Sequence, residues 1–297
     1  MMVKTGLTIP SLQFAAPAGT PAGIEVMSLT ELAGRMSPER LARPQRPHFH
    51  QLIAVTGGSL QQTIDFRTYE LAAGDWLWIR PGQVQQWGAL AGVTGDLVLF
   101  QPSHLDAQTA GRVQLDDPNV PVLRQPSADD AASVRMALDH LALEFRALGR
   151  MPLESHAASL RYLLAVLVLR LTHLAVPVTE PAVAADPAYL RFRSAVDSDF
   201  TRTRRVEDYA RSLGYSAKTL ARATQAAAGV SAKAFIDRRV VLEAKRLLAH
   251  SDDSAVQISQ QLGFRTPTQF AKYFVQRTGQ TPMAFRSEVS GRLSVPG

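Results

Sequence analysis

The sequence predicts an α+β protein of two domains, in which a β-barrel and two long helices precede an all-α double helix-turn-helix. The chain has 297 residues, more than one hydrophobic core usually holds. Short apolar runs separated by turn residues precede residue 100, and helical patterns with polar caps follow residue 187. We expect the barrel in 1–126, a helical segment of the same domain in 127–175, a linker in 176–187 and the helix-turn-helix domain in 188–297.

The barrel strands are expected between residues 51 and 100. Apolar runs there are short and are separated by Gly57-Gly58, Gly74-Asp75 and Pro81-Gly82. Short runs bounded by Gly, Pro and Asp are typical of an antiparallel sandwich or small barrel. The expected strands are 51–56, 59–66, 69–71, 76–79 and 97–100.

Two helical patterns follow the strands. The first has one apolar stripe, formed by Val134, Leu138, Leu141, Phe145 and Leu148. The second begins after Pro152 and is apolar nearly all round between residues 160 and 174. A helix that needs cover on several sides indicates packing on the barrel and on a second subunit, hence a homodimer. Burial within one domain is the alternative.

The linker and the charge distribution separate the two domains. Residues 176–187 contain three prolines and no hydrophobic period, which favours a linker. The net charge is +6, but residues 1–185 sum to −2 and residues 186–297 to +8. A basic module joined to a near-neutral one indicates that the last part binds nucleic acid. A solvated basic surface is the alternative.

Composition excludes several classes of protein. The 46% hydrophobic and 20% charged residues are typical of a globular chain. With no cysteine, a disulfide framework, a cysteine-ligated metal and a thiol nucleophile are excluded. The first residues lack the apolar region of a signal peptide, and the most apolar run, 163–169, is too short to cross a bilayer. We therefore expect a cytoplasmic protein with no membrane partner.

An internal repeat is the most specific signal. Leu213-Gly214-Tyr215-Ser216 is echoed by Leu262-Gly263-Phe264-Arg265 after 49 residues, and the pattern beyond each turn is echoed after 50. Each copy has a short helix, a turn in which glycine permits positive φ, and a second helix opened by a hydroxyl cap. The repeat predicts two helix-turn-helix units joined by a helix over 232–249.

The outward side chains of each second helix are candidate DNA contacts. Leu220 and Ala223 are expected inward in the first copy, and Phe270, Tyr273 and Phe274 in the second. Arg and Lys donate to guanine, Gln pairs with adenine and a Thr methyl meets thymine. The expected base contacts are Lys218, Thr219, Arg222 and Gln225, and Thr268, Gln269, Lys272 and Gln276. The expected phosphate contacts are the caps Ser216 and Thr266 with Arg238 and Arg239, which like Lys245 and Arg246 are expected outward on the joining helix.

The basic part resembles the AraC/XylS family of bacterial transcription regulators. The resemblance rests on LGYSAKTLARATQAAAGVSAKAFIDRRVVLEAKRLL at 213–248 and on ISQQLGFRTPTQFAKYFVQRTGQTPMAF at 258–285. It implies two recognition helices in adjacent major grooves of promoter DNA, and recruitment or blocking of RNA polymerase. Ala223 and Thr224 stand where the family usually has bulkier apolar residues, so the first unit is expected to pack more loosely.

The N-terminal part looks like the cupin-type sensor that many members of this family carry. The resemblance lies in PHFHQLIAVTGGSLQQTIDF at 47–66 and LAAGDWLWIRPGQVQQW at 71–87. His48 and His50 stand one residue apart, as in a cupin metal site, and strand alternation would point both to one face. The acidic ligand and the third histidine are missing, so we expect no metal, no cofactor and no catalytic residue.

The sequence favours a non-catalytic pocket in this half. An apolar wall with a few polar anchors suits a small molecule. The expected lining is His48, His50, Trp76, Trp78, Gln85 and Trp87. The alternative is that the tryptophans fill a core or a dimer face. The sequence thus predicts a DNA-binding regulator that responds to an unidentified small-molecule effector. A metal-dependent cupin enzyme and a ligand-independent constitutive regulator are the alternatives.

Overall fold

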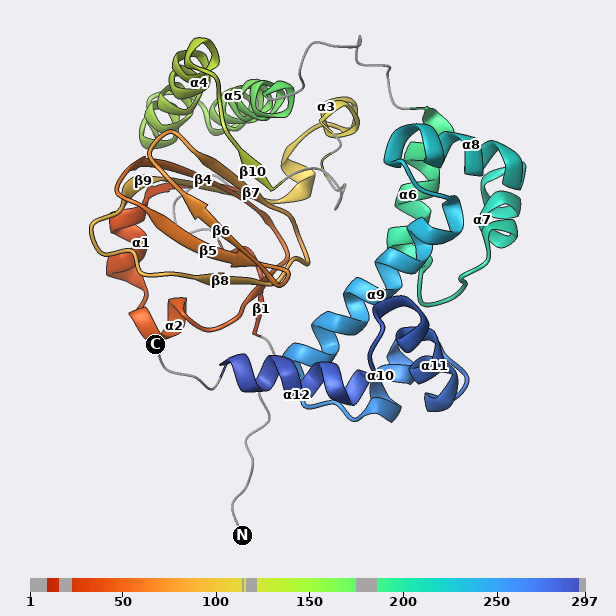
Figure 1. Cartoon of the computed structure of the whole chain (residues 1–297). Coiled ribbons are helices and arrows are strands. Elements are labelled where there is room, and N and C mark those ends of the chain that lie inside the picture. Colours follow the sequence, from red (N-terminus) through yellow and green to blue (C-terminus); the bar gives the residue numbers. More distant parts are fainter. Residues whose placement is uncertain (1–9, 16–22, 114, 116–121, 175–185, 294–297) are drawn as a thin grey trace. The chain divides into compact units, whose positions relative to one another are not determined.

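The computed structural model describes residues 10–15, 23–113, 115, 122–174 and 186–293. These residues fall into two compact units, an N-terminal unit within 10–174 and a C-terminal unit within 186–293. The N-terminal unit combines β-sheets with helices and the C-terminal unit is all-helical, as Figure 1 shows. The predicted linker lies outside the described residues except for Asp186 and Pro187, which cap and begin the first helix of the C-terminal unit.

The strands of the N-terminal unit pair into separate sheets. Five of them form a sheet in the order β10-β7-β4-β9-β2, three form a sheet in the order β6-β5-β8, and β1 pairs with β3. A closed barrel stays a prediction. The strand bounds are β1 (Ser11–Leu12), β2 (Ile24–Ser28), β3 (Arg46–Pro47), β4 (His50–Gly57), β5 (Leu60–Ile64), β6 (Arg67–Leu71), β7 (Trp76–Ile79), β8 (Gln85–Trp87), β9 (Thr94–Phe100) and β10 (Leu123–Arg124).

Local chemistry accounts for the hairpin of the smaller sheet. Ile64 pairs with Arg67, so Asp65 and Phe66 form a two-residue loop. Both have positive φ, 46° and 71°, as a type I′ turn requires. The Asp65 carboxylate accepts hydrogen bonds from the backbone N–H of Val84 at 3.0 Å and from the Gln83 amide at 3.1 Å, which fixes this loop to the segment before β8.

The helices of the N-terminal unit are short except for α4 and α5. Their bounds are α1 (Leu29–Arg35), α2 (Pro38–Leu41), α3 (Ala107–Arg112), α4 (Ala128–Arg146) and α5 (Leu153–His173). The second long helix starts after Pro152 as predicted. Leu148 was wrongly expected in the apolar stripe of the first, because α4 ends at Arg146 and Leu148 is exposed.

Two hydrophobic clusters lie on opposite faces of the five-stranded sheet. One joins Leu52, Trp76, Trp78 and Val98 to the inner faces of α4 and α5. The other fills the space between the two larger sheets, where Ile53 and Leu77 meet Leu60 and Trp87. Successive residues of a strand point to opposite faces, so β4 and β7 contribute to both clusters.

The C-terminal unit has seven helices among the described residues, packed around one cluster of apolar side chains. Ser216, Ser231 and Thr266 each accept a hydrogen bond from the third residue of the helix that follows, as predicted for caps. The bounds are α6 (Pro187–Asp199), α7 (Val206–Leu213), α8 (Ala217–Ala228), α9 (Ala232–His250), α10 (Ala255–Gln261), α11 (Pro267–Thr278) and α12 (Pro282–Leu293).

Among the described helices, none is both long enough and apolar enough to cross a membrane.

Candidate nucleic-acid interface

The predicted repeat folds as two helix-turn-helix units. In the first, α7 and α8 meet at Gly214, and in the second, α10 and α11 meet at Gly263. Both glycines have positive φ, 72° and 71°, a conformation that glycine adopts without strain. α9 joins the two helix-turn-helix units. It begins at the predicted residue, Ala232, and ends at His250, one residue later than predicted.

The inward faces of α8 and α11 are buried as predicted. Leu220 and Ala223 on α8 are buried, as are Phe270 and Phe274 on α11, and Tyr273 is half-buried. Thr224 is fully buried and its hydroxyl donates to the Leu220 carbonyl at 2.7 Å. The buried Thr224 hydroxyl therefore has a hydrogen-bond partner within α8.

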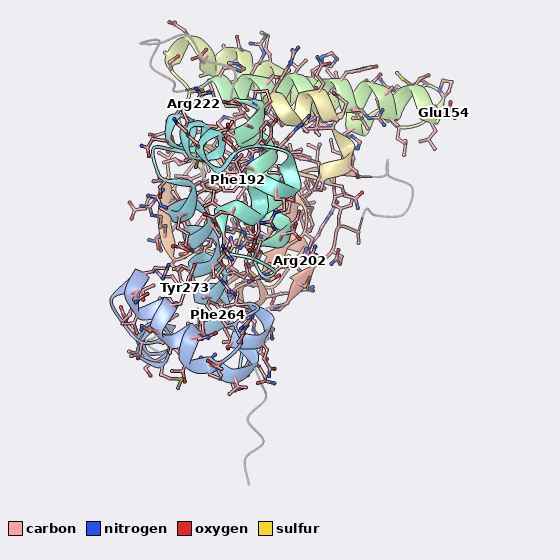
Figure 2. All side chains as sticks on the ribbon, turned by 90° about the vertical axis from the view of Figure 1, so that its right-hand side faces the viewer. Glu154, Phe192, Arg202, Arg222, Phe264 and Tyr273 are labelled. Atoms are coloured by element: carbon pink, nitrogen blue, oxygen red, sulfur yellow. The ribbon has the colours of Figure 1, made fainter. Side chains whose placement is uncertain are left out.

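The outward faces carry the predicted polar side chains. Seven of the eight candidates are exposed, and the eighth, Thr219, is half-buried with its hydroxyl 2.8 Å from Ser216 Oγ. Arg222 is marked on α8 in Figure 2. The exposed ones are Lys218, Arg222, Gln225, Thr268, Gln269, Lys272 and Gln276.

The basic side chains of α9 are not all outward. Arg238 is exposed as predicted. The Arg239 side chain is only 18% exposed; it pairs with Asp197 at 3.0 Å and Glu243 at 3.2 Å. Arg246 is 5% exposed and pairs with Glu243 at 3.3 Å. The expectation that Arg239 and Arg246 point outward was wrong, because carboxylates of α6 and α9 hold them against the unit.

A basic hollow of about 430 Å³ lies beside α11. It is lined by side chains of three segments: the loop before α7, the start of α9, and the second helix-turn-helix unit. Its residues are Arg204, Arg205, Lys233, Phe264, Gln269, Lys272, Tyr273, Gln276 and Arg277. Sequence reasoning assigned no role to Arg204, Arg205 or Lys233, because contacts between segments this far apart leave no local pattern.

Asp237 organises the cations of this hollow. It accepts hydrogen bonds from Lys233 at 2.6 Å and from the Tyr273 hydroxyl at 2.6 Å, and Arg277 lies 2.8 Å from its other oxygen. Burial by itself would raise the pKa of Asp237, but these three donors outweigh burial and hold the pKa below its usual value. The carboxylate is therefore charged and partly compensates the cations around it.

The predicted effector pocket does not assemble. His48 is exposed whereas His50 is fully buried, because β4 begins only at His50 and strand alternation does not apply to His48. Trp76 and Trp78 face α4 and α5. Trp87 lies on the other side of the five-stranded sheet, between the sheets. The six residues therefore cannot line a single cavity.

Two smaller polar arrangements take the place of that pocket. On the helix side, the Trp78 indole donates to His50 Nδ1 at 3.3 Å. On the smaller sheet, the Gln62 amide donates to Gln85 Oε1 at 3.2 Å. The side-chain amide oxygens (Oε1) of Gln51 and Gln62 are buried and have no hydrogen-bond partner among the described residues. Nowhere among the described residues of either unit do three His, Asp or Glu side chains gather where a metal ion could bind.

Two family models match the chain. The AraC-like ligand binding domain matches residues 31–154, and a helix-turn-helix domain matches residues 209–288. The second match spans both helix-turn-helix units. The first covers most of the N-terminal unit.

Individual curated relatives match about a third of the chain. The HTH-type transcriptional regulator YisR of Bacillus subtilis is 32% identical over 88 residues, 30% of this chain and 31% of that protein. The regulatory protein PocR of Salmonella typhimurium is 30% identical over 101 residues, 34% of this chain and 33% of that protein. The matched regions thus span about a third of these relatives.

Among solved structures, the DNA-binding domain of the global transcriptional factor AdpA, in complex with a target DNA, is 27% identical. The match covers 36% of this chain and 96% of the solved chain, with a TM-score of 0.33. The assignment rests on the two family models, in the order that the fold shows. Because the chain carries an AraC-like ligand binding domain followed by a helix-turn-helix domain, it belongs to the AraC family of transcriptional regulators.

Proposed function

We propose that the protein is a sequence-specific DNA-binding regulator of transcription that responds to a small molecule bound by its N-terminal unit. The observation that carries the proposal is the pair of exposed polar faces on α8 and α11. Each faces away from a buried apolar stripe of a helix-turn-helix unit, as a recognition helix in a major groove requires. The proposed base contacts are Lys218, Thr219, Arg222 and Gln225, and Thr268, Gln269, Lys272 and Gln276.

Phosphate contacts come from the side chains around these helices. Ser216 and Thr266 cap the recognition helices, and Arg238 is exposed on α9. The hollow adds Arg205 and Lys233, whose side chains are 74% and 46% exposed. Arg239 is the weakest of the expected phosphate contacts, since its guanidinium already has two carboxylate partners.

Selection from a random DNA library with the full chain tests this function. We expect enrichment of two short half-sites about one helical turn apart, because each recognition helix enters one major groove. The logarithm of the binding constant for the selected DNA should fall linearly with the logarithm of salt concentration, with a slope of about −0.9 per phosphate contacted. A chain that enriches no sequence is not a sequence-specific regulator.

For the effector we propose the interior between the two larger sheets. Buried amide oxygens without partners cost about 1–3 kcal/mol each, so the carbonyls of Gln51 and Gln62 favour a ligand or water that donates hydrogen bonds. Trp87 would supply the apolar wall. A thermal-shift screen of metabolites tests this site, with Gln62→Leu as the variant and the exposed neighbour Gln61→Leu as its control.

A hit whose shift Gln62→Leu abolishes and Gln61→Leu retains supports the site. DNA binding with no thermal shift for any metabolite would instead favour the ligand-independent regulator.

We also propose a homodimer formed through α4 and α5. These helices expose Met136 at 67%, Leu143 at 60% and Tyr162 at 70%. Apolar side chains gathered on two adjacent helices favour a protein partner, and equal copies of one surface pair in a two-fold dimer. Such a regulator would act on RNA polymerase at the promoter, which transcription in vitro with the selected site would measure.

A further inference from the structure

The loop that precedes the first helix-turn-helix unit touches the turn of the second unit. The loop runs from residue 200 to 205, between α6 and α7, and the turn is Leu262-Gly263-Phe264. A Cβ added to Gly263 would lie 1.7 Å from the carbonyl oxygen of Thr201. Glycine is therefore required at 263 for space as well as for its positive φ, whereas a Cβ on Gly214 would meet nothing within 4 Å.

Arg204 secures this contact. One of its terminal nitrogens donates to the Leu262 carbonyl. Its guanidinium carbon lies 3.6 Å from the centre of the Phe264 ring, a cation–π distance. Phe264 and Tyr273, which line the same hollow, are marked in Figure 2. Burial lowers the pKa of Arg204, as expected for a guanidinium packed into a contact and not left in solvent.

The loop is itself fixed to the first unit. The Thr203 hydroxyl donates a hydrogen bond to the Asp208 carboxylate at 2.6 Å. The same hydroxyl oxygen accepts a hydrogen bond from the backbone N–H of Arg205 at 3.2 Å. The Tyr209 hydroxyl donates to the Thr203 carbonyl at 3.2 Å. Because Asp208 and Tyr209 belong to α7, these hydrogen bonds hold the loop that carries Arg204 against the first helix-turn-helix unit.

The two helix-turn-helix units are thus joined in two places. One connection is α9, whose 19 residues make a rod about 28 Å long, and rods of this length bend. The other is the contact between Arg204 and the turn of the second unit. With both connections present, bending of α9 that changed the angle between α8 and α11 would have to break the contact between Arg204 and the turn.

We propose that Arg204 is a positioning residue that fixes the spacing and rotation between the two recognition helices, so that the chain reads its half-sites at one separation. The proposal rests on the function proposed above. It assigns to Arg204 no contact with a base. Its loss should relax the required spacing and leave the preferred half-site sequences unchanged.

The experiment compares DNA sites of different spacing with the full chain. Starting from the site selected by the unaltered protein, one base pair is added or removed between the half-sites, which turns one half-site by about 36°. The variants are Arg204→Met and its control Arg202→Met, which removes a cation that is 80% exposed on the same loop. Affinities are measured by fluorescence anisotropy at one salt concentration.

The unaltered protein and Arg202→Met should lose about tenfold or more in affinity on either altered site. Arg204→Met should lose less than about threefold, and random-library selection with it should give the same half-sites at several spacings. Phe264→Leu removes the stacking surface but stays apolar, and should show the same relaxation if Arg204→Met fails to fold.

An unchanged spacing penalty in both variants overturns the positioning role while leaving DNA recognition intact. Failure of the unaltered protein to select any DNA overturns the proposed function, and this inference with it.

Discussion

The Tyr273 hydroxyl donates a hydrogen bond to Asp237 over 2.6 Å and so fastens the second recognition helix to α9. Both groups are adapted to this contact. Burial and the neighbouring carboxylate raise the pKa of Tyr273, which keeps its proton. Burial opposes the charge of Asp237, but the hydrogen-bond donors around this carboxylate hold its pKa below the usual value. The charged carboxylate therefore accepts the hydrogen bond from Tyr273.

Tyr273→Phe should therefore destabilise the C-terminal unit. Removing one donor from a partly buried carboxylate costs about 1.5–3 kcal/mol, and urea unfolding followed by circular dichroism would measure the loss. Tyr215→Phe is the control, because the Tyr215 hydroxyl makes no hydrogen bond among the described residues. Equal stability of the two variants would mean that Asp237 gains nothing from Tyr273.

The two turn glycines should respond differently to alanine. Gly214→Ala introduces only an unfavourable positive φ, which costs about 1–2 kcal/mol. Gly263→Ala adds a collision with the Thr201 backbone and should cost several times more. Thermal unfolding of the two variants compares the costs directly. Similar melting temperatures would show that the loop and the turn do not touch in solution.

A proposed base contact can be separated from a general effect on charge. Gln269→Ala on α11 should weaken binding to the selected site by about 1–3 kcal/mol and relax discrimination at one or two positions. Gln260→Ala, at another exposed glutamine, on α10, should change neither the affinity nor the discrimination. Competition binding with every single-base variant of the site gives the answer. A uniform loss across all sequences would reassign Gln269 to the backbone.

The N-terminal unit should lose stability in mild acid through His104. Burial, with a smaller effect of Arg161, lowers the pKa of His104 to about 4, whereas in the unfolded chain it is about 6.5. The unfolded state therefore binds the proton first, so stability is complete above pH 6.5 and falls as pH drops towards 4.

The expected loss is about 2 kcal/mol, because one pKa unit corresponds to about 1.4 kcal/mol and residual solvent access reduces the effect. His104→Gln should flatten the pH dependence of urea unfolding, and the exposed His140→Gln should not. Nuclear magnetic resonance titration of the histidine rings gives an independent value. A ring assigned to His104 that titrates near 6.5 contradicts its burial.

Dimerisation through α4 and α5 predicts a simple change of mass. Tyr162→Lys places a charge on a side chain that is 70% exposed, which a monomer tolerates and an apolar interface does not. Light scattering should show dimers for the unaltered chain and monomers for this variant. Met283→Lys, an exposed apolar position on α12, should remain dimeric. A monomeric unaltered chain would contradict the proposal.

Local signals predicted the C-terminal unit well. The hydroxyl caps, the turn glycines and the apolar faces of α8 and α11 are all set by residues within one turn of each other. Arg239 was misplaced because its main partner, Asp197, lies 42 positions earlier on α6. An arginine in a helical pattern is expected in solvent unless a distant carboxylate is known.

The N-terminal unit was predicted less completely. Trp76 and Trp78 lie on one face of β7, as alternation along a strand requires. It could not show that Trp87 belongs to another sheet, since pairing between strands depends on tertiary structure. The short polar strand β8 was not predicted as a separate element, because Gln85-Gln86-Trp87 has neither the length nor the alternation of a strand signal.

The position of the tryptophans gives the chain a built-in optical marker. All three, Trp76, Trp78 and Trp87, belong to the N-terminal unit. Indole emission from the intact protein therefore reports on that unit alone, and a DNA-induced change in emission would be a direct signal that one unit senses the state of the other. The same emission followed beside far-ultraviolet dichroism would reveal whether the two units melt together or in succession.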